Sequence, residues 1–284
     1  MKAVRTRLEL REALDAARAA GSSIGLVPTM GALHDGHLSL LRAARRACDV
    51  VVVTLFVNPT QFGAGEDLAS YPRDEARDTA LAEAEGADLL FAPAAEELYP
   101  VGFATTVVVS GLSEVLCGAP ESRGAEHFRG VTTVVAKLLN LVRPDVAYFG
   151  QKDAQQAIVL KRMVRDLDFG VRIDVLPTVR DPDGLAMSSR NRYLSAEERE
   201  RAVALSRALR AAESTAAAGE RSVDAVLAAA RSQLRDAGIE PEYLEARDAE
   251  DLTPARSLNG RPVLVALAAR VGRARLIDNT LIGG

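Results

Sequence analysis

The sequence predicts an α/β protein in which a parallel sheet with flanking helices is followed by a smaller C-terminal α+β domain. Helical periodicity alternates with short β-branched runs over residues 1–178, and this alternation is typical of a parallel sheet. From about residue 179 the pattern changes to two long alanine-rich helical stretches and three short strands. Apolar residues make up 48% and charged residues 26% of the 284 residues, which is enough apolar material for a sizeable core.

In the first part, amphipathic periodicity predicts helices and β-branched runs predict strands. The helices are expected at residues 7–20, 36–47, 73–85, 131–142 and 154–167. The strands are expected at residues 24–28, 50–57, 88–92, 105–109, 146–149 and 171–176. Because ligands of such sheets bind beyond the carboxyl ends of strands, the loops that follow these strands are where a site is expected.

In the second part, a polar loop over residues 180–192 leads into helices at 196–218 and 223–237. Ser195 and Glu198 have the spacing of a capping box at the start of the first helix, and Gly219 is a suitable residue to end it. Short strands are expected at 243–247, 263–269 and 275–278. We therefore expect two domains, residues 1–178 and 179–284.

The composition argues against nucleic-acid binding. The chain has 35 basic and 39 acidic side chains, so its net charge of −4 provides no basic groove. Aromatic residues make up only 4% and tryptophan is absent, so a platform for stacking single-stranded bases is not expected either.

The sequence also predicts a protein of the reducing cytoplasm. Its longest apolar stretch, residues 50–57, is far shorter than the roughly 20 residues that a membrane-spanning helix needs. The charged residues of the first ten positions do not resemble a secretory signal. Cys48 and Cys117 are isolated from each other, which indicates neither a zinc ribbon nor a disulfide framework.

The segment P-T-M-G-A-L-H-D-G-H at 28–37 is the first candidate site, because it places two of the three histidines between a strand and a helix. The free N–H groups and positive dipole of a helix N-terminus favour a phosphate, and Gly31 and Gly36 allow it to approach the backbone. An imidazole with an ordinary pKa of about 6.5 could carry a proton there at modest cost. The alternatives are a zinc pair, for which only His127 and two separated cysteines could complete the ligands, and ordinary polar loop residues.

The second candidate, F-V-N-P-T-Q-F-G at 56–63, leaves the end of a strongly apolar strand. The amides of Asn58 and Gln61 could bind the hydroxyls and carboxylate of a small polar substrate. The alternative is a turn stabilised by Asn58, with phenylalanines that belong to the core.

Two further loops carry cations. Lys152, in Y-F-G-Q-K-D-A-Q-Q at 148–156, would lie near a helix N-terminus, where a cation is disfavoured without an anionic partner. In M-S-S-R-N-R at 187–192, two hydroxyls and Arg190 could close over a triphosphate. Taken singly, each has an ordinary explanation: an N-cap at Asp153 beside a solvated lysine, and an interdomain linker. Four such loops at strand ends together favour a nucleotide-phosphate site.

These motifs resemble those of the pantothenate synthetase family, within the nucleotidyltransferases with an H-x-G-H signature. The resemblance rests on the segments at 28–37, 56–62, 127–131, 149–156 and 183–191, which occur in the order of that family. It implies a Rossmann-like nucleotidyltransferase domain that binds ATP and pantoate, with the C-terminal domain as a lid. It also implies ATP- and Mg²⁺-dependent condensation of pantoate with β-alanine through a pantoyl adenylate, releasing AMP and pyrophosphate, in a cytoplasmic homodimer.

The resemblance assigns roles to individual residues. His37 corresponds to the proton donor of the family, and His34, Lys152 and Arg190 are the other expected catalytic groups. Gln61 and Gln156 would hold pantoate, Gln61 would also border β-alanine, and Asn58 is a further candidate. The expected ATP contacts are Met30, Gly31, Ala32, Leu33, His34, Asp35, Gly36, His37, Gly150, Gln151, Lys152, Asp153, Val179, Met187, Ser188, Ser189 and Arg190.

The sequence departs from the family pattern at three places. Gln151 and Asp35 stand where an acidic residue and glutamate are common. Arg123 is spaced one residue too far from His127 for the expected R-x-x-H-F, so it is left outside the expected site. No residue is assigned as a ligand of Mg²⁺ or as the base for the β-alanine amine.

Two rival functions remain. One is a nucleotidyltransferase that leaves the nucleotide on its product, and the other is a sensor that binds ATP without turnover.

Overall fold

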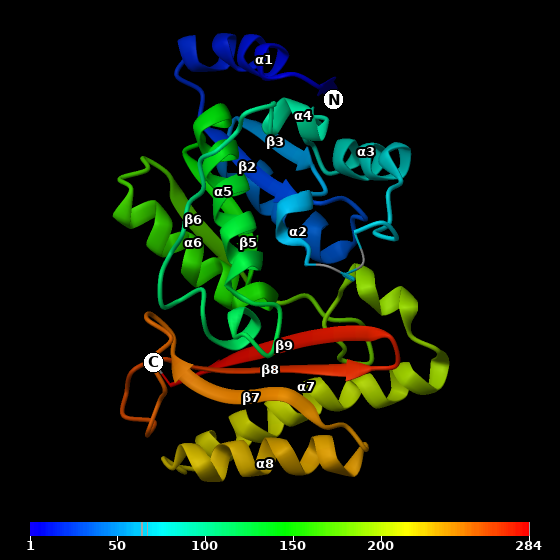
Figure 1. Ribbon diagram of the computed structural model, residues 1–284, viewed down its shortest axis with the longest axis vertical. Coiled ribbons are helices and arrows are strands. Elements are labelled where there is room, and N and C mark those ends of the chain that lie inside the picture. Colours follow the sequence, from blue (N-terminus) through cyan, green and yellow to red (C-terminus); the bar gives the residue numbers. More distant parts are fainter. Residues whose placement is uncertain (64, 67, 284) are drawn as a thin grey trace.

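The computed structural model describes residues 1–63, 65–66 and 68–283 and contains two sheets. Figure 1 shows the six-stranded sheet with its helices in the upper part of the molecule and the three-stranded sheet below it. The N-terminus lies at the far end of the upper part, while the C-terminus lies beside the lower sheet.

The larger sheet is parallel throughout and has the order β1-β4-β3-β2-β5-β6. Its strands are β1 (Lys2–Val4), β2 (Ile24–Thr29), β3 (Val50–Leu55), β4 (Leu89–Phe91), β5 (Val146–Gly150) and β6 (Arg172–Leu176). From β2 the chain adds β3 and β4 on one side, and it then returns to add β5 and β6 on the other. The order therefore reverses between β2 and β5, and a ligand crevice is expected at the carboxyl ends of these two strands.

Helices cover both faces of this sheet. They are α1 (Arg7–Ala19), α2 (Asp35–Ala47), α3 (Glu75–Ala84), α4 (Ala95–Leu98), α5 (Ala125–Val142) and α6 (Ala154–Asp166). Because side chains alternate along a strand, Leu26 and Val52 pack on the side of α1, α5 and α6, while Val27 and Val53 pack on the side of α2 and α3. The near-continuous apolar strands of the sequence thus reflect burial on both faces.

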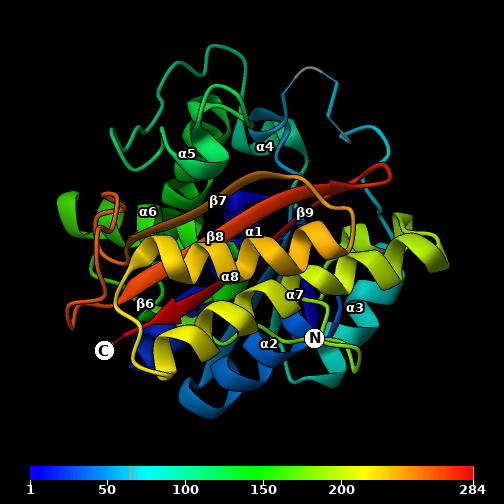
Figure 2. The same ribbon diagram turned by 90° about the horizontal axis from the view of Figure 1, so that it is seen from below.

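The C-terminal part is an antiparallel sheet covered by two helices. It comprises α7 (Ala196–Ala217), α8 (Val223–Asp236), β7 (Pro241–Asp248), β8 (Val263–Val271) and β9 (Ala274–Ile282). Seen from below, α7 and α8 run side by side across the strands (Figure 2). Alternate residues of β8 pack beneath these helices, whereas Leu264 and Ala266 join the core of the larger unit. These two cores support a domain boundary near residues 178 and 179, which we propose.

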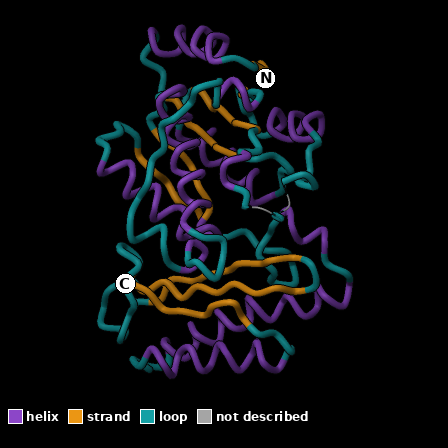
Figure 3. Tube along the Cα trace, viewed as in Figure 1, coloured by secondary structure: helices purple, strands orange, loops and turns teal. Residues whose placement is uncertain are grey.

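The expected strand at 105–109 is not formed: this segment is part of the long loop between α4 and α5 (Figure 3). The backbone of Val107 is instead bonded by threonine side chains of α5, with Thr132 Oγ1 donating to its carbonyl at 2.6 Å and its N–H donating to Thr133 Oγ1 at 3.0 Å. The threonine hydroxyls of α5 therefore make the hydrogen bonds that a neighbouring strand would have made if residues 105–109 had joined a sheet.

Three other elements differ from expectation. Helix α4, which has only four residues, was not predicted. The three-residue strand β1 was not predicted, because it is too short for a periodic pattern. Helix α5 begins at Ala125 rather than residue 131, and its extra turns contain His127. Gly130 weakens the helical pattern but is required, because a Cβ atom there would lie 2.4 Å from the carbonyl oxygen of Thr60. The remaining expected helices and strands are present, with small differences at their ends.

Candidate active site

The loops that follow β2, β3, β5 and β6 meet around one cavity of about 230 Å³ at the expected switch point. A second cavity of about 450 Å³ adjoins it, shares Lys152, Asp153 and Arg190 with it, and extends to β9. The expected residues that line the first cavity are Met30, His34, Gly36, His37, Gln61, Gly150, Lys152, Asp153, Gln156, Val179, Met187, Ser188, Ser189 and Arg190.

The other expected residues do not line this cavity. Leu33 is 1% exposed and belongs to the core beneath α2. Asp35 is exposed and lies 3.9 Å from the guanidinium of Arg42. Gly31 and Ala32 form a turn beside α3, and Asn58 and Gln151 bond to neighbouring protein groups.

The two histidines cap helix α2 reciprocally. His34 is the N-cap, and its Nδ1 accepts a hydrogen bond from the Gly36 N–H at 3.2 Å. The Nδ1 of His37 accepts from the His34 N–H at 3.4 Å, and the two ring centroids are 4.1 Å apart. Gly36 is required by this arrangement, because a Cβ atom there would lie 2.9 Å from Nδ1 of His34. The geometry matches a capping box in which imidazoles replace the usual hydroxyl and carboxylate.

This arrangement keeps both imidazoles neutral. Burial, together with the nearby Lys152, lowers the pKa of His34 to about 4. Burial, together with His34, lowers the pKa of His37 to about 3. The expectation that these rings take up a proton at modest cost therefore does not hold in these surroundings. Since each Nδ1 accepts a backbone hydrogen bond, the single proton of each ring is on Nε2, which can donate to an anion.

A buried carboxylate from α3 holds the turn that leads to these histidines. Asp78 is 1% exposed and accepts hydrogen bonds from the N–H of Ala32 at 2.7 Å and of Leu33 at 2.8 Å. Gly31 and Ala32 have φ angles of 88° and 52°, a left-handed conformation that is strained for alanine. Asp78 therefore fixes the entry to α2, and charged hydrogen bonds of this kind are among the stronger ones.

Asn58 is a support for Gln61 rather than part of the cavity wall. It is 1% exposed, and its Nδ2 donates to Gln61 Oε1 at 3.0 Å and to the Gly130 carbonyl at 3.1 Å. Its Oδ1 accepts from the hydroxyl of Tyr99 at 2.8 Å. Because both ends of this amide are bonded inside the protein, it fixes the orientation of the Gln61 side chain.

His127 and Arg123 support the backbone of the same residue. His127 Nδ1 lies 2.8 Å from the Gln61 carbonyl oxygen and its Nε2 lies 3.1 Å from Arg123. Burial and the positive charge of Arg123 lower the pKa of His127 to about 4, so Nδ1 carries the proton and Nε2 accepts. Arg123 also forms an ion pair with Glu66. Both residues line the cavity, so the altered spacing in the sequence did not remove Arg123 from the site.

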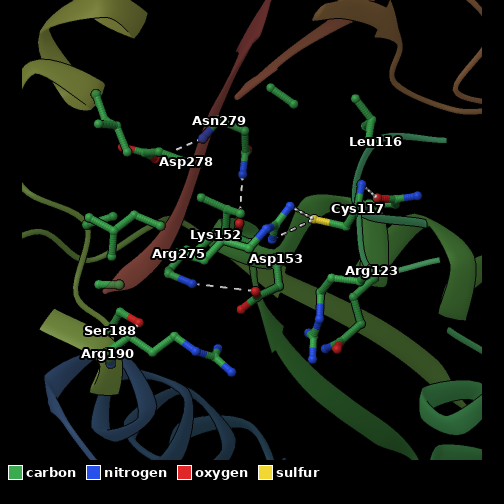
Figure 4. Close-up of a pocket in the computed structure, with 18 of the residues that line it drawn as sticks. Leu116, Cys117, Arg123, Lys152, Asp153, Ser188, Arg190, Arg275, Asp278 and Asn279 are labelled. Atoms are coloured by element: carbon green, nitrogen blue, oxygen red, sulfur yellow. Dashed lines mark hydrogen bonds and ion pairs between the residues drawn. The ribbon is translucent and has the colours of Figure 1, made fainter. Parts of the chain in front are cut away.

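Lys152 and Arg190 bring positive charge to the cavity from separate loops. Lys152 Nζ lies 3.5 Å from Asp153 Oδ1 (Figure 4). Burial of Asp153 is more than offset by the charges of Lys152 and Arg190, which hold its pKa below the ordinary value. Ser188 Oγ accepts from the Arg190 N–H at 3.3 Å, which starts the turn of residues Ser189–Tyr193. The lysine and the histidine pair thus face one space, as required of a triphosphate site.

No pattern in the sequence indicates the role of Asp78. It lies 46 residues from Ala32 in a highly charged stretch of helix α3, where a carboxylate is ordinary. His127 and Arg123 had one signal, the H-F-R-G segment, but their contact with Gln61 depends on the start of α5 at Ala125. Contacts between distant segments are decided by packing, so local patterns do not reveal them.

The fold and this site define a nucleotidyltransferase-like α/β enzyme with an additional C-terminal unit. A family model described as pantoate-beta-alanine ligase matches residues 2–281. The chain belongs to the pantoate-beta-alanine ligase family, and it is an enzyme of the ligase class that joins carbon to nitrogen.

Comparison with individual proteins agrees with this assignment. The chain is 55% identical over 286 residues to a pantothenate synthetase of Moorella thermoacetica, covering 99% of each chain. Its structure is similar to that of pantothenate synthetase from Thermus thermophilus, with a TM-score of 0.92, 48% identity and 100% of each chain covered. A pantoate-beta-alanine ligase from Francisella tularensis, complexed with beta-gamma ATP and beta-alanine, has a TM-score of 0.80 at 32% identity, with coverage of 99% of this chain and 97% of that one.

Replacing Asp78 by Asn should destabilise the protein and weaken its activity. The amide retains one acceptor and directs its NH₂ group at a backbone N–H, which costs about 1–3 kcal/mol of unfolding free energy. Urea unfolding and steady-state kinetics with varied ATP would measure both effects. Asp74→Asn is the matched control, because Asp74 caps the same helix through Arg77 N–H and asparagine caps equally well. Equal stability of the two variants would contradict the role of Asp78.

The three histidines should make stability depend on pH above the range in which carboxylates titrate. Their pKa values of about 4, 3 and 4 lie below the ordinary 6.5 of the unfolded chain. The unfolded state therefore binds more protons, and this stabilisation is complete above pH 6.5 and is lost as the pH falls through 4 for His34 and His127 and through 3 for His37. At pH 5 each histidine contributes a slope of up to about 1.4 kcal/mol per pH unit. Urea unfolding between pH 5 and 7 should show a slope that His127→Gln reduces by about a third; an unchanged slope would refute the buried neutral state.

Proposed function

We propose that this enzyme condenses pantoate with β-alanine in an ATP-dependent reaction, through a pantoyl adenylate, and releases AMP and pyrophosphate. Membership of the pantoate-beta-alanine ligase family supports the overall reaction. The ATP and beta-alanine bound to the relative from Francisella tularensis support the two ligands. The observation that carries the proposal is the single cavity lined by the neutral histidine pair, Lys152, Arg190 and two glutamines.

In the first step, a carboxylate oxygen of pantoate attacks the α-phosphorus, and the bond to the β-phosphate breaks. This carboxylate is ionised at neutral pH, so the step needs placement and charge stabilisation rather than a base. Gln61 and Gln156 both line the cavity and are suited to hold the hydroxyls and carboxylate of pantoate. Lys152 and Arg190 are suited to stabilise the charge that develops on the departing pyrophosphate.

The histidines contribute hydrogen bonds without first binding a proton. Each neutral ring offers Nε2–H beside the N-terminus of α2, and together they can bind phosphoryl oxygens. A bound polyphosphate would also raise the pKa of both rings, because its charge favours the imidazolium. In the second step, the amine of β-alanine attacks the acyl carbon, the acyl–phosphate bond breaks, AMP leaves, and the nitrogen gives up a proton to solvent.

Asp153 fits a role in holding Mg²⁺ together with the nucleotide. It lines both cavities, and the charges beside it keep its pKa low, so its carboxylate is ionised at neutral pH and would offer an oxygen ligand to the ion. The part of the chain that the structure describes has no cluster of three or more metal-binding side chains. Mg²⁺ commonly binds through one or two carboxylates plus substrate phosphates, so Asp153 together with the nucleotide could hold it, and the ion would neutralise phosphate charge here.

We further propose a cytoplasmic homodimer. The loop between α4 and α5 exposes Val101 at 108% and Val108 at 57%, and Val108 lies within the segment 105–109 that was expected to form a strand. Such a segment could pair with its counterpart in a second copy, which sedimentation equilibrium would test.

Cys48 and Cys117 are buried free thiols, in keeping with a reducing compartment. Among the residues described here, no helix combines the length and apolar character needed to span a bilayer.

Replacing Lys152 or His37 by Ala should slow adenylation on the order of 10² to 10⁴-fold, the usual range for such groups. The measurement is pantoate-dependent exchange of label between pyrophosphate and ATP. Lys161→Ala, on the exposed surface of α6, is the control and should exchange at the wild-type rate. Near-normal exchange in both site variants would contradict the assignment.

In the wild type, AMP that appears only when ATP, pantoate and β-alanine are all present would exclude a plain nucleotidyltransferase and an ATP sensor.

Gln61→Ala and Gln156→Ala should impair the use of pantoate more than that of ATP. Removing an amide that holds a polar substrate typically costs about 1–3 kcal/mol, or roughly 5- to 150-fold in kcat/KM for pantoate. Steady-state kinetics with each substrate varied in turn would separate the two effects. Gln233→Ala on α8 controls for loss of an amide remote from the cavity. Equal losses for pantoate and ATP, with the fold intact, would count against these roles.

A further inference from the structure

Strand β9 places two consecutive buried polar residues between the two units. It is an edge strand of the smaller sheet, and Asp278 and Asn279 on it are 2% and 5% exposed. Because neighbouring side chains of a strand point to opposite faces, the two residues reach different parts of the chain. Figure 4 shows both of them beside the cavity that contains Lys152 and Arg190.

Asn279 bonds to the turn that carries Lys152. Its Nδ2 donates to the carbonyl oxygens of Gln151 and Lys152, each at 2.9 Å. Its Oδ1 accepts from Nε2 of Gln151 at 2.9 Å. One amide of the C-terminal sheet therefore fixes the backbone on which the lysine stands.

Asp278 bonds to the loop that carries Arg190. Both of its carboxylate oxygens accept from the guanidinium of Arg180, at 2.6 and 3.0 Å. Arg180 pairs with Ala186 in an isolated antiparallel bridge, and the Met187 N–H donates to the Val179 carbonyl at 3.0 Å. The loop is thereby a closed hairpin, and its far side continues directly into Ser188, Ser189 and Arg190.

We propose that Asp278 and Asn279 are positioning residues that set the distance between Lys152 and the Ser188–Arg190 segment, so that both can contact one triphosphate. The role follows from the juxtaposition: consecutive residues of one rigid strand hold the two cation-bearing loops, which belong to different units of the fold. Two cations near each other repel, so their spacing in the absence of ligand has to be imposed by bonds to the backbone and to other side chains. The naming of the ligand as the triphosphate of ATP rests on the proposed function.

A purely structural role would be different in a measurable way. If Asn279 only joins the two units, its loss should weaken ATP binding to the same extent whether or not the lysine side chain is present. If it acts by placing Lys152, its loss should matter little once that side chain is removed. A double-mutant cycle separates these cases.

The experiment measures the dissociation constant of ATP with Mg²⁺ by calorimetry, without pantoate, for wild type, Asn279→Ala, Lys152→Ala and the double variant. Loss of the three hydrogen bonds to the turn should weaken binding on the order of tenfold in Asn279→Ala. The double variant should bind within about threefold of Lys152→Ala, as expected for coupled residues. Thr280→Ala is the matched control, because Thr280 follows on the same strand and bonds to Glu213 of α7; its affinity should equal that of wild type. Equal affinity of Asn279→Ala and wild type, or a full additive loss in the double variant, would overturn the proposal for Asn279.

A second cycle, with Asp278→Asn and Arg190→Ala, tests the other arm and decides the matter if Asn279→Ala does not fold. Asp278→Asn keeps the volume but breaks the bidentate pair, so it should weaken ATP binding in the wild-type background and have little effect beside Arg190→Ala. Additive losses of ATP affinity in the double variant would refute the proposed role of Asp278. Thermal unfolding of each variant checks the fold.

These binding cycles do not need turnover. A wild type that binds ATP but shows no pantoate-dependent release of pyrophosphate would contradict the proposed function and would leave the result of the binding cycles valid.

Discussion

The site depends on one topological constraint: β2 and β5 are adjacent parallel strands from which the chain departs in opposite directions. Their carboxyl ends therefore open onto a crevice that no crossover helix covers. The histidine segment follows β2 and the lysine turn follows β5, so the two groups face each other although they are far apart in the sequence. The turn after β3 and the loop after β6 complete the wall from either side.

Within this crevice, interactions inside the protein hold the groups that are proposed to bind phosphate. Burial keeps the two imidazoles of α2 neutral, which avoids placing further positive charge beside Lys152. The lysine itself lies beside the ionised Asp153. A bound polyphosphate would therefore meet preorganised neutral donors at a helix N-terminus and two cations, and an arrangement of this kind needs little reorganisation during the reaction.

A layer of buried polar residues supports the groups that line the cavity. Asp78 holds the turn before the histidines, Asn58 holds the side chain of Gln61, and His127 holds its backbone. Asn279 holds the lysine turn from the other sheet. Each of these side chains is bonded at both ends or by both oxygens, as expected for polar groups removed from water. The shape of the cavity thus depends on these supporting residues as well as on the groups expected to contact a ligand.

The sequence by itself determined the alternation of strands and helices, the four loops at strand ends and the chemical nature of the histidines, Lys152, Arg190 and Gln61, because periodicity and motif spacing are local properties of the chain. Only the tertiary structure decided the protonation of the histidines, since burial sets their pKa values. It alone also decided that Asn58 lies behind Gln61, that Val107 bonds to α5 instead of joining a sheet, and that Asp78 and Asn279 reach loops remote in sequence. These are contacts between distant segments, and the packing that creates them leaves no trace in any local pattern.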